Sequence, residues 1–185
     1  MLKNLATIYK GNYSEENIIF TRVWSMPNAW TFSIQPIKSL LDRYVGGGAG
    51  WVDPFAGKNS PAEITNDHNP EREAKFHMEA IDFCNYLTGR YNGVLFDPPY
   101  SFRQISEHYK SLGQKATQIQ TSMKFYESVK TAMCEKIKIG GYAISCGWNT
   151  NGFGKARGFK ILEIMCVAHG GSKNDTIVTV EQKIK

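Results

Sequence analysis

A chain of 185 residues, 42% hydrophobic and 12% aromatic, can bury one core, and we expect a single domain over residues 1–185. Its apolar runs are too short for a membrane span, its first ten residues lack the apolar stretch of a signal peptide, and its four cysteines have no C-x-x-C spacing. These features exclude membrane, disulfide-rich and zinc proteins from our expectations and favour a cytoplasmic protein, whose net charge of +5 permits a polyanionic partner.

The first part of the chain is predicted to hold one packed loop and one helix between short strands. Residues 17–20 fit a short strand or a turn, and residues 24–37 form a loop dense in aromatic residues and prolines. Residues 37–45 place apolar side chains at helical spacing, and the glycines that follow end that helix. Residues 51–53 form a strand that runs into a tight turn.

The middle of the chain is predicted to alternate strands with helices, as α/β proteins do. Strands are expected at residues 62–65 and 93–96, with a helix at residues 71–87 between them. Residues 101–122 have weak periodicity and are expected to form a mobile loop over a site. Residues 125–138 place apolar side chains at four-residue spacing, which indicates a packed helix.

The end of the chain is predicted to complete the sheet. Residues 142–146 form a strand, and a polar, glycine-rich loop follows over residues 147–158. Residues 159–168 and 176–184 read as two strands joined by a turn, which predicts an antiparallel hairpin at the edge of the sheet. With no repeat and no linker, the pattern predicts one α/β domain.

A candidate catalytic motif follows the strand at residues 93–96. Asp97 stands at the carboxyl edge of the sheet, where open α/β sheets bind ligands, and Pro98 and Pro99 make the turn stiff. A carboxylate, the carbonyl of Pro98 and the ring of Tyr100 suit a planar base with an exocyclic amine, which they could hold by hydrogen bonds and stacking. The plainer alternative is a Pro-Pro turn that ends a core strand, with Asp97 as a cap.

Two further acids mark candidate cofactor positions. The strand at residues 51–53 ends in Asp53 and a turn that contains Gly57, and in doubly wound sheets the first strand end carries the cofactor. Asp67 follows the next strand, where an acid commonly holds a ribose diol. An ordinary strand–turn and a solvated turn acid are the alternatives for these two positions.

Together these motifs carry a family resemblance. Asp53-Pro54-Phe55-Ala56-Gly57, followed by Asp67 and then by Asp97-Pro98-Pro99-Tyr100, resembles the class I S-adenosylmethionine-dependent methyltransferases, and within them the N6-adenine DNA methyltransferases of small phage and prophage type. The resemblance covers residues 22–185. It implies a mostly parallel, seven-stranded Rossmann-like sheet with helices on both faces and a C-terminal antiparallel hairpin.

The resemblance also implies roles for individual residues. It assigns catalysis to Asp97, Pro98, Pro99 and Tyr100. It assigns S-adenosylmethionine, which leaves as S-adenosylhomocysteine, to residues that hold its methionine end, its ribose and its adenine, with no metal. These are Thr31, Phe32, Ser33, Asp53, Pro54, Phe55, Ala56, Gly57, Asp67, Glu79 and Ala80.

The implied partner is adenine-containing DNA, expected as a duplex, in the cytoplasm of a bacterial or phage-infected cell. Arg103, Lys155 and Arg157 are candidates for phosphate contacts, although each also fits a solvated charge. Two features depart from the family pattern. Lys58 and Asn59 follow Gly57 where a second glycine is usual, and no insertion is large enough for a target-recognition domain, so recognition would fall to surface loops or a homodimer's second subunit.

Two other functions stay open on the sequence. RNA adenine methylation keeps the chemistry and changes the polymer. A module that binds the cofactor without catalysis, and that occupies DNA or regulates a partner, fits the unusual Lys58-Asn59 turn and the absent recognition domain. The intact Asp97-Pro98-Pro99-Tyr100 motif favours DNA methylation over both.

Overall fold

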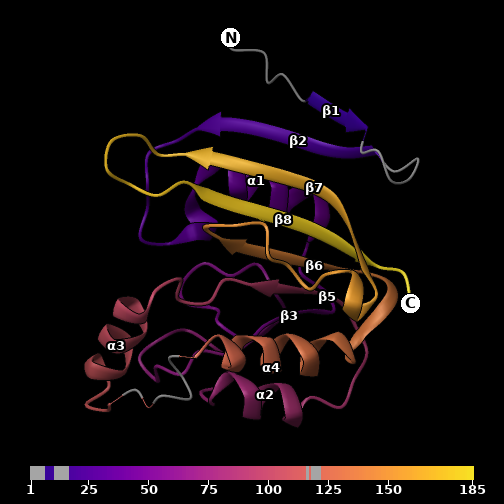
Figure 1. Cartoon of the computed structure of the whole chain (residues 1–185). Helices are drawn as coiled ribbons and strands as arrows, with labels where there is room; N and C mark the ends of the chain where they lie inside the picture. The colour runs from indigo at the N-terminus through magenta and orange to yellow at the C-terminus, as the bar shows by residue number, and fades with distance from the viewer. Residues whose placement is uncertain (1–6, 11–16, 116, 118–121) are drawn as a thin grey trace.

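The computed structural model describes residues 7–10, 17–115, 117 and 122–185, which form one eight-stranded sheet with helices packed against it (Figure 1). The strands are β1 (Thr7–Lys10), β2 (Asn17–Trp24), β3 (Trp51–Asp53), β4 (Ile64–Thr65), β5 (Tyr91–Phe96), β6 (Ile137–Gly147), β7 (Phe159–Ala168) and β8 (Thr176–Lys183). The helices are α1 (Gln35–Tyr44), α2 (Ala80–Tyr86), α3 (Phe102–Ser111) and α4 (Met123–Cys134), with 3-10 turns η1 (Thr31–Ser33) and η2 (Lys155–Arg157).

The strand order is β1-β2-β7-β8-β6-β5-β3-β4. The pairs β2–β7, β5–β6, β3–β5 and β3–β4 are parallel, and β8 runs antiparallel between β6 and β7. The predicted mostly parallel sheet and C-terminal hairpin are therefore confirmed. Strands β2 to β8 make the expected seven, and β1 adds an eighth on the far side of β2.

The hairpin lies inside the sheet, so its predicted place at the edge is wrong. Residues 17–20, expected as a short strand or a turn, belong to the eight-residue strand β2, which pairs with β7 and extends the sheet beyond it. The alternation of exposed and half-buried residues in β2 explains why its apolar signal is weak.

Helices cover both faces of the sheet, as expected. On one face α1 buries Ile37, Leu40 and Leu41 against β5 to β8. On the other face α2 and α4 lie side by side (Figure 1) and bury apolar side chains against Val52 and Val94 of the central strands. In the described ranges no helix combines the length and the apolar character that a bilayer crossing needs.

Two segments differ from the prediction. Of the helix expected at residues 71–87 only α2 forms, because the buried side chain of Asn66 accepts from the backbone amide of Met78 and donates to its carbonyl, which holds the preceding segment extended beside β4. Residues 101–122, expected as a mobile loop, contain α3, whose first turn has a capping box made by Ser101 and Gln104. Residues 116 and 118–121 of that range lie outside the described part of the chain.

Candidate active site

A cavity of about 300 Å³ opens at the carboxyl ends of β3, β4 and β5, where α3 and the start of α4 close over them. This is the edge at which α/β sheets bind ligands. Among the predicted site residues, the following line it: Thr31, Phe32, Pro54, Phe55, Ala56, Gly57, Asp67, Glu79, Ala80, Asp97, Pro98, Pro99 and Tyr100. Ser33, Asp53, Arg103, Lys155 and Arg157 are not among the lining residues.

Asp97 sits at the centre of a small hydrogen-bonded group directly after β5. The phenol of Tyr100 donates to Asp97 Oδ1, and the side chain of Thr31 lies beside the Asp97 carboxylate. Burial raises the pKa of Asp97 to about 6, although Tyr100 and Thr31 oppose the shift by favouring the anion. The carboxylate is therefore placed to accept an N–H at the cavity wall and to titrate just below neutral pH.

Tyr100 was expected to offer a free aromatic face, but its ring is held in place. Besides the bond to Asp97, its backbone amide donates to Gln104 Oε1 at 2.7 Å, which ties the Pro-Pro turn to the first turn of α3. The ring meets Trp148 edge to face, with centroids 5.8 Å apart. The phenol occupies Oδ1 alone, so the second carboxylate oxygen of Asp97 can still accept from an incoming amine.

Asp53 holds the backbone of the loop after β3 in place without lining the cavity. Its buried carboxylate accepts from the amide of Phe55 at 2.9 Å and from the hydroxyl of Ser60 at 2.6 Å. Burial, together with the neighbouring charges of Asp97 and Asp67, raises the pKa of Asp53 to about 7, although the hydrogen bonds from Ser60 and Phe55 favour the anion. Asp53 thus fixes the loop geometry, while the residues after it face the cavity.

The Lys58-Asn59 departure has a simple structural account. Gly57 and Asn59 have φ values of +53° and +67°, and Asn59 is the one described residue other than glycine in this left-handed region. Asparagine tolerates that conformation better than other side chains, so it substitutes for the usual second glycine. Its amide also donates to Ser33 Oγ at 2.8 Å, which joins the loop to η1 and explains why Ser33 is turned away from the cavity.

Asp67 follows β4 and is drawn into the same loop. One carboxylate oxygen accepts from the amide of Gly57 at 2.9 Å, and the other accepts from the amide of Asn69 at 2.7 Å. Each oxygen retains a lone pair, so the carboxylate can still accept from a ligand hydroxyl. Asp67 is buried except where it faces the cavity.

A polar cluster on the α3 side of the cavity was missed by the sequence analysis. The phenol of Tyr109 in α3 donates to Glu79 Oε1 at 2.6 Å. The ring of His68 lies against Tyr109 and His108, with centroids 5.1 and 5.6 Å away, and its buried Nδ1 has no hydrogen-bond partner in the described chain. Only the position of His68 directly after Asp67 could have pointed to it.

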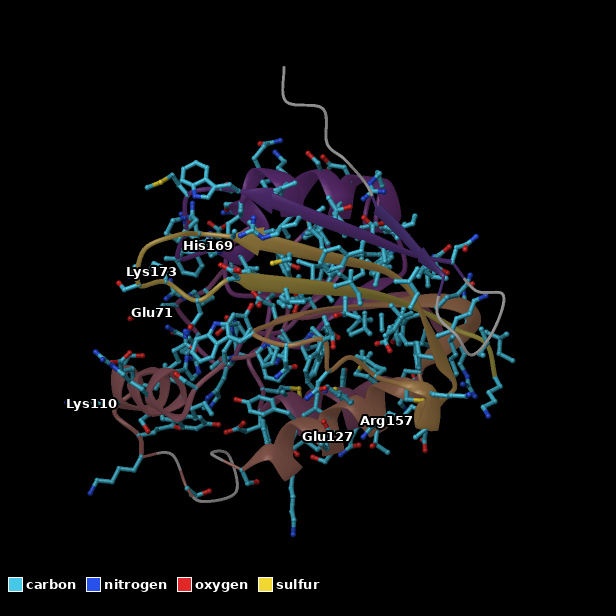
Figure 2. The ribbon with its side chains drawn as sticks, turned by 45° about the horizontal axis from the view of Figure 1, so that its top comes forward. Glu71, Lys110, Glu127, Arg157, His169 and Lys173 are labelled. Carbon is cyan, nitrogen blue, oxygen red and sulfur yellow. The ribbon has the colours of Figure 1, made fainter. Side chains whose placement is uncertain are left out.

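The predicted phosphate contacts stand apart from this cavity. The guanidinium of Arg157 pairs with Glu127 at 2.8 Å and donates to the carbonyl of Phe153 at 3.1 Å (Figure 2). Arg103 pairs with Glu107 on the exposed face of α3, and Lys155 is exposed in η2. The lysine and arginine that do line the cavity are Lys58, which the unusual loop after Gly57 had already suggested near a cofactor, and Arg72, which sequence analysis did not single out. The Arg72 guanidinium lies 4.9 Å from the ring of Trp30.

The chemistry of the lining fits S-adenosylmethionine. Three carboxylates, of Asp67, Glu79 and Asp97, line the cavity together with seven phenylalanine, tyrosine and tryptophan rings, which suits a ligand that carries positive charge, a ribose and a planar base. Lys58 and Arg72 supply positive charge for a carboxylate at the rim. The seven rings are those of Trp30, Phe32, Phe55, Tyr100, Tyr109, Phe125 and Tyr126.

No family model and no curated protein matches the sequence. Solved structures do match the fold. TrmN from Thermus thermophilus superposes with a TM-score of 0.55 at 15% identity, over 82% of this chain and 49% of its own, so the chain spans about half its length. A 1,6-didemethyltoxoflavin-N1-methyltransferase from Burkholderia thailandensis, with S-adenosylhomocysteine bound, gives 0.55 at 11% identity over 82% and 78% of the two chains. The putative methyltransferase yhhF from Escherichia coli gives 0.54 at 9% identity over 86% and 92%.

The strand order supports assignment to the fold of these methyltransferases. A central parallel sheet, a reversed strand β8 inserted between β6 and β7, and a cavity at the carboxyl ends of β3 to β5 occur together in this chain. The chain has the fold of the class I S-adenosylmethionine-dependent methyltransferases.

Proposed function

We propose that the protein transfers a methyl group from S-adenosylmethionine to the N6 amine of adenine in DNA. The observation that carries the proposal is the position of Asp97, whose carboxylate lies at the cavity wall beside Thr31 and accepts from the hydroxyl of Tyr100. An exocyclic amine presents two N–H donors, and its lone pair is delocalised into the ring. A carboxylate that accepts one of these donors favours the geometry in which the lone pair is free to react.

The cofactor, when bound, supplies a methyl group on a positively charged sulfur. The loop of residues 54–57 and the carboxylates of Asp67 and Glu79 would hold its methionine, ribose and adenine parts. Asp53 and Asn59 keep that loop in shape from outside the cavity, through their bonds to Phe55, Ser60 and Ser33. These residues would serve to bind the cofactor.

Asp97 and Pro98 would hold the acceptor. No hydrogen bond within the described residues engages the Pro98 carbonyl, so it is available to accept the second N–H of the amine. As the new N–C bond forms and the S–C bond breaks, the nitrogen gains positive charge, and the Asp97 carboxylate can take the proton that it loses. A carboxyl pKa of about 6 suits that role better than an unperturbed one.

The protein is incubated with S-adenosylmethionine and unmethylated genomic DNA, either native or heat-denatured, and modified adenines are mapped by sequencing. We expect N6-methyladenine at defined sites. Methyl transfer to structured RNA but not to DNA would show that the substrate is RNA. Cofactor binding without transfer to either polymer would favour a non-catalytic binding module. The supporting observation for such a module is the hydrogen bond between Tyr100 and Asp97, which occupies one oxygen of the carboxylate.

A further inference from the structure

Large apolar side chains are exposed along the same edge of the sheet as the candidate site. Trp24 is 64% exposed, Met26 67% and Trp148 44%. Trp24 ends β2 and Trp148 follows β6, and both strands run parallel to β5, so these residues and Asp97 share the carboxyl edge, on the left in Figure 1. We call Trp24, Met26 and Trp148 the aromatic rim.

The loop that carries Trp148 is held firmly, so its exposure does not come from a loose segment. The buried carboxylate of Glu181 accepts from the amides of Phe153 and Gly154, at 2.5 and 2.8 Å. Lys130, also buried, donates to the carbonyl of Asn151 at 3.1 Å. Two buried charged groups thus fix the loop that places an exposed indole beside Tyr100.

The segment that carries Trp24 and Met26 is also anchored, and it leads into the site. The ring of His169 is hydrogen-bonded to the carbonyl of Ser25 at 2.8 Å and to the hydroxyl of Thr176 at 2.9 Å. From there the chain runs through exposed residues to Thr31, whose side chain contacts Asp97. The rim is therefore continuous with the acceptor side of the cavity.

The charges around this edge suit a polyanion. Among the described residues, Lys173 has no carboxylate within ion-pair distance, and Lys58 and Arg72, which we assign to the cofactor's carboxylate, have no protein carboxylate at that distance either. Lys173 lies in the turn next to His169, and Lys110 of α3 projects on the same side of the molecule (Figure 2). The carboxylate of Glu71 also stands at this edge, so the positive charge is local rather than uniform.

We infer that the acceptor is an unpaired DNA strand laid across this edge, with the bases next to the target stacked on Trp148 and Trp24. The inference rests on the proposed function and refines its substrate. Paired bases hide their faces inside a duplex, so exposed indoles gain nothing from them, whereas an unpaired strand offers a face at every base. The target adenine then enters beside Tyr100 without the cost of unpairing.

The test uses a fluorescein-labelled, adenine-containing 20-nucleotide DNA strand, alone or annealed to its complement, and measures binding by anisotropy at two salt concentrations. The full chain is compared with Trp148→Ala, Trp24→Ala and the control Ile139→Ala. Ile139 is 74% exposed near the start of β6, at the opposite edge. We expect the single strand to bind more tightly than the duplex, and each tryptophan variant to lose about five- to a hundredfold in affinity for it, with Ile139→Ala unchanged.

Equal or tighter binding of the duplex, or tryptophan variants that bind the single strand as the unaltered chain does, would overturn the inference. Tighter binding of single-stranded RNA of the same sequence would overturn the choice of DNA. Unchanged S-adenosylhomocysteine binding by Trp148→Ala shows that the variant is folded. If binding depends on the tryptophans but no methyl group is transferred to any nucleic acid, the proposed function is wrong while the binding of a single strand at the aromatic rim stands.

Discussion

At the scale of the residue, the carboxylate of Asp97 concentrates the chemistry of this protein. In the proposed reaction it must be ionised to take the proton that the amine loses, yet burial has raised its pKa to about 6. Because the anion is the active form, the transfer rate should rise with pH and level off above about pH 7. Single-turnover rates measured from pH 5 to pH 8 with saturating cofactor and DNA would check this, and a rate that falls as pH rises through 6 would contradict it.

Replacing Asp97 separates chemistry from binding. Asp97→Ala should slow methyl transfer by about a hundredfold or more, because the amine loses the acceptor that orients it. Cofactor affinity, measured by calorimetry, should stay close to that of the unaltered chain, because the loop of residues 54–57 and Asp67 are untouched. Retained transfer in Asp97→Ala would remove the catalytic assignment.

Asp53 should make the free energy of unfolding depend on pH. Its folded-state pKa, about 7, lies above the ordinary value near 3.8, so the folded state binds a proton more tightly than the unfolded state. The resulting stabilisation is complete below about pH 4 and is lost as pH rises through 7. Urea unfolding at pH 5 and pH 8 should show a smaller decrease for Asp53→Asn than for the unaltered chain, and an equal decrease would contradict the assignment.

At the scale of the element, the sequence predicted those strands that local patterns of apolar and turn-forming residues define. The strands β3, β5 and β7 are rich in apolar residues, and the expected ranges match them closely. An aspartate ends β3 and another follows β5, which marks the ends of these two strands. The prediction failed where tertiary contacts decide. The buried amide of Asn66 prevents helix before α2, and β2 is recognised as a strand only through its pairing with β7.

The same division applies to the site. Strand ends placed Asp97, Asp67 and the loop at Gly57 correctly at one cavity, because parallel strands bring their carboxyl ends to one edge. His68 and Tyr109 were missed because they meet only when α3 packs over the loop after β4. The inward or outward direction of a loop side chain cannot be predicted from spacing either.

The turn at residues 57–59 offers a test of how an element tolerates change. Asn59→Ala forces alanine into a left-handed conformation and removes the bond to Ser33, so it should cost about 1–2 kcal/mol of unfolding free energy. Asn59→Gly keeps the conformation without strain and should cost clearly less. Denaturant titration of both variants distinguishes them, and equal losses would show that the hydrogen bond, not the backbone, matters.

At the scale of the whole molecule, the cavity and the aromatic rim share one edge of one sheet. The carboxyl ends of β3 and β4 carry the loop that we propose binds the cofactor (the cofactor loop), β5 carries Asp97, and β2 and β6 extend the same edge with the aromatic rim. Interior strands and helices on both faces support this edge, and the loops beyond it carry most of the residues that line the cavity. Binding at the cofactor loop should therefore stabilise the whole domain.

Thermal unfolding measures that coupling. S-adenosylhomocysteine at a hundred times its dissociation constant should add about 2.7 kcal/mol to the unfolding free energy, because it binds only the folded state. For a domain of this size that corresponds to a rise of about 5–10 °C in Tm. Asp97→Ala should show the same rise, because its carboxylate serves the acceptor, whereas Gly57→Val, which places a β-branched side chain at a φ of +53° in the loop, should show little. An unaltered chain whose Tm does not respond to the ligand would show that the cavity is not a cofactor site.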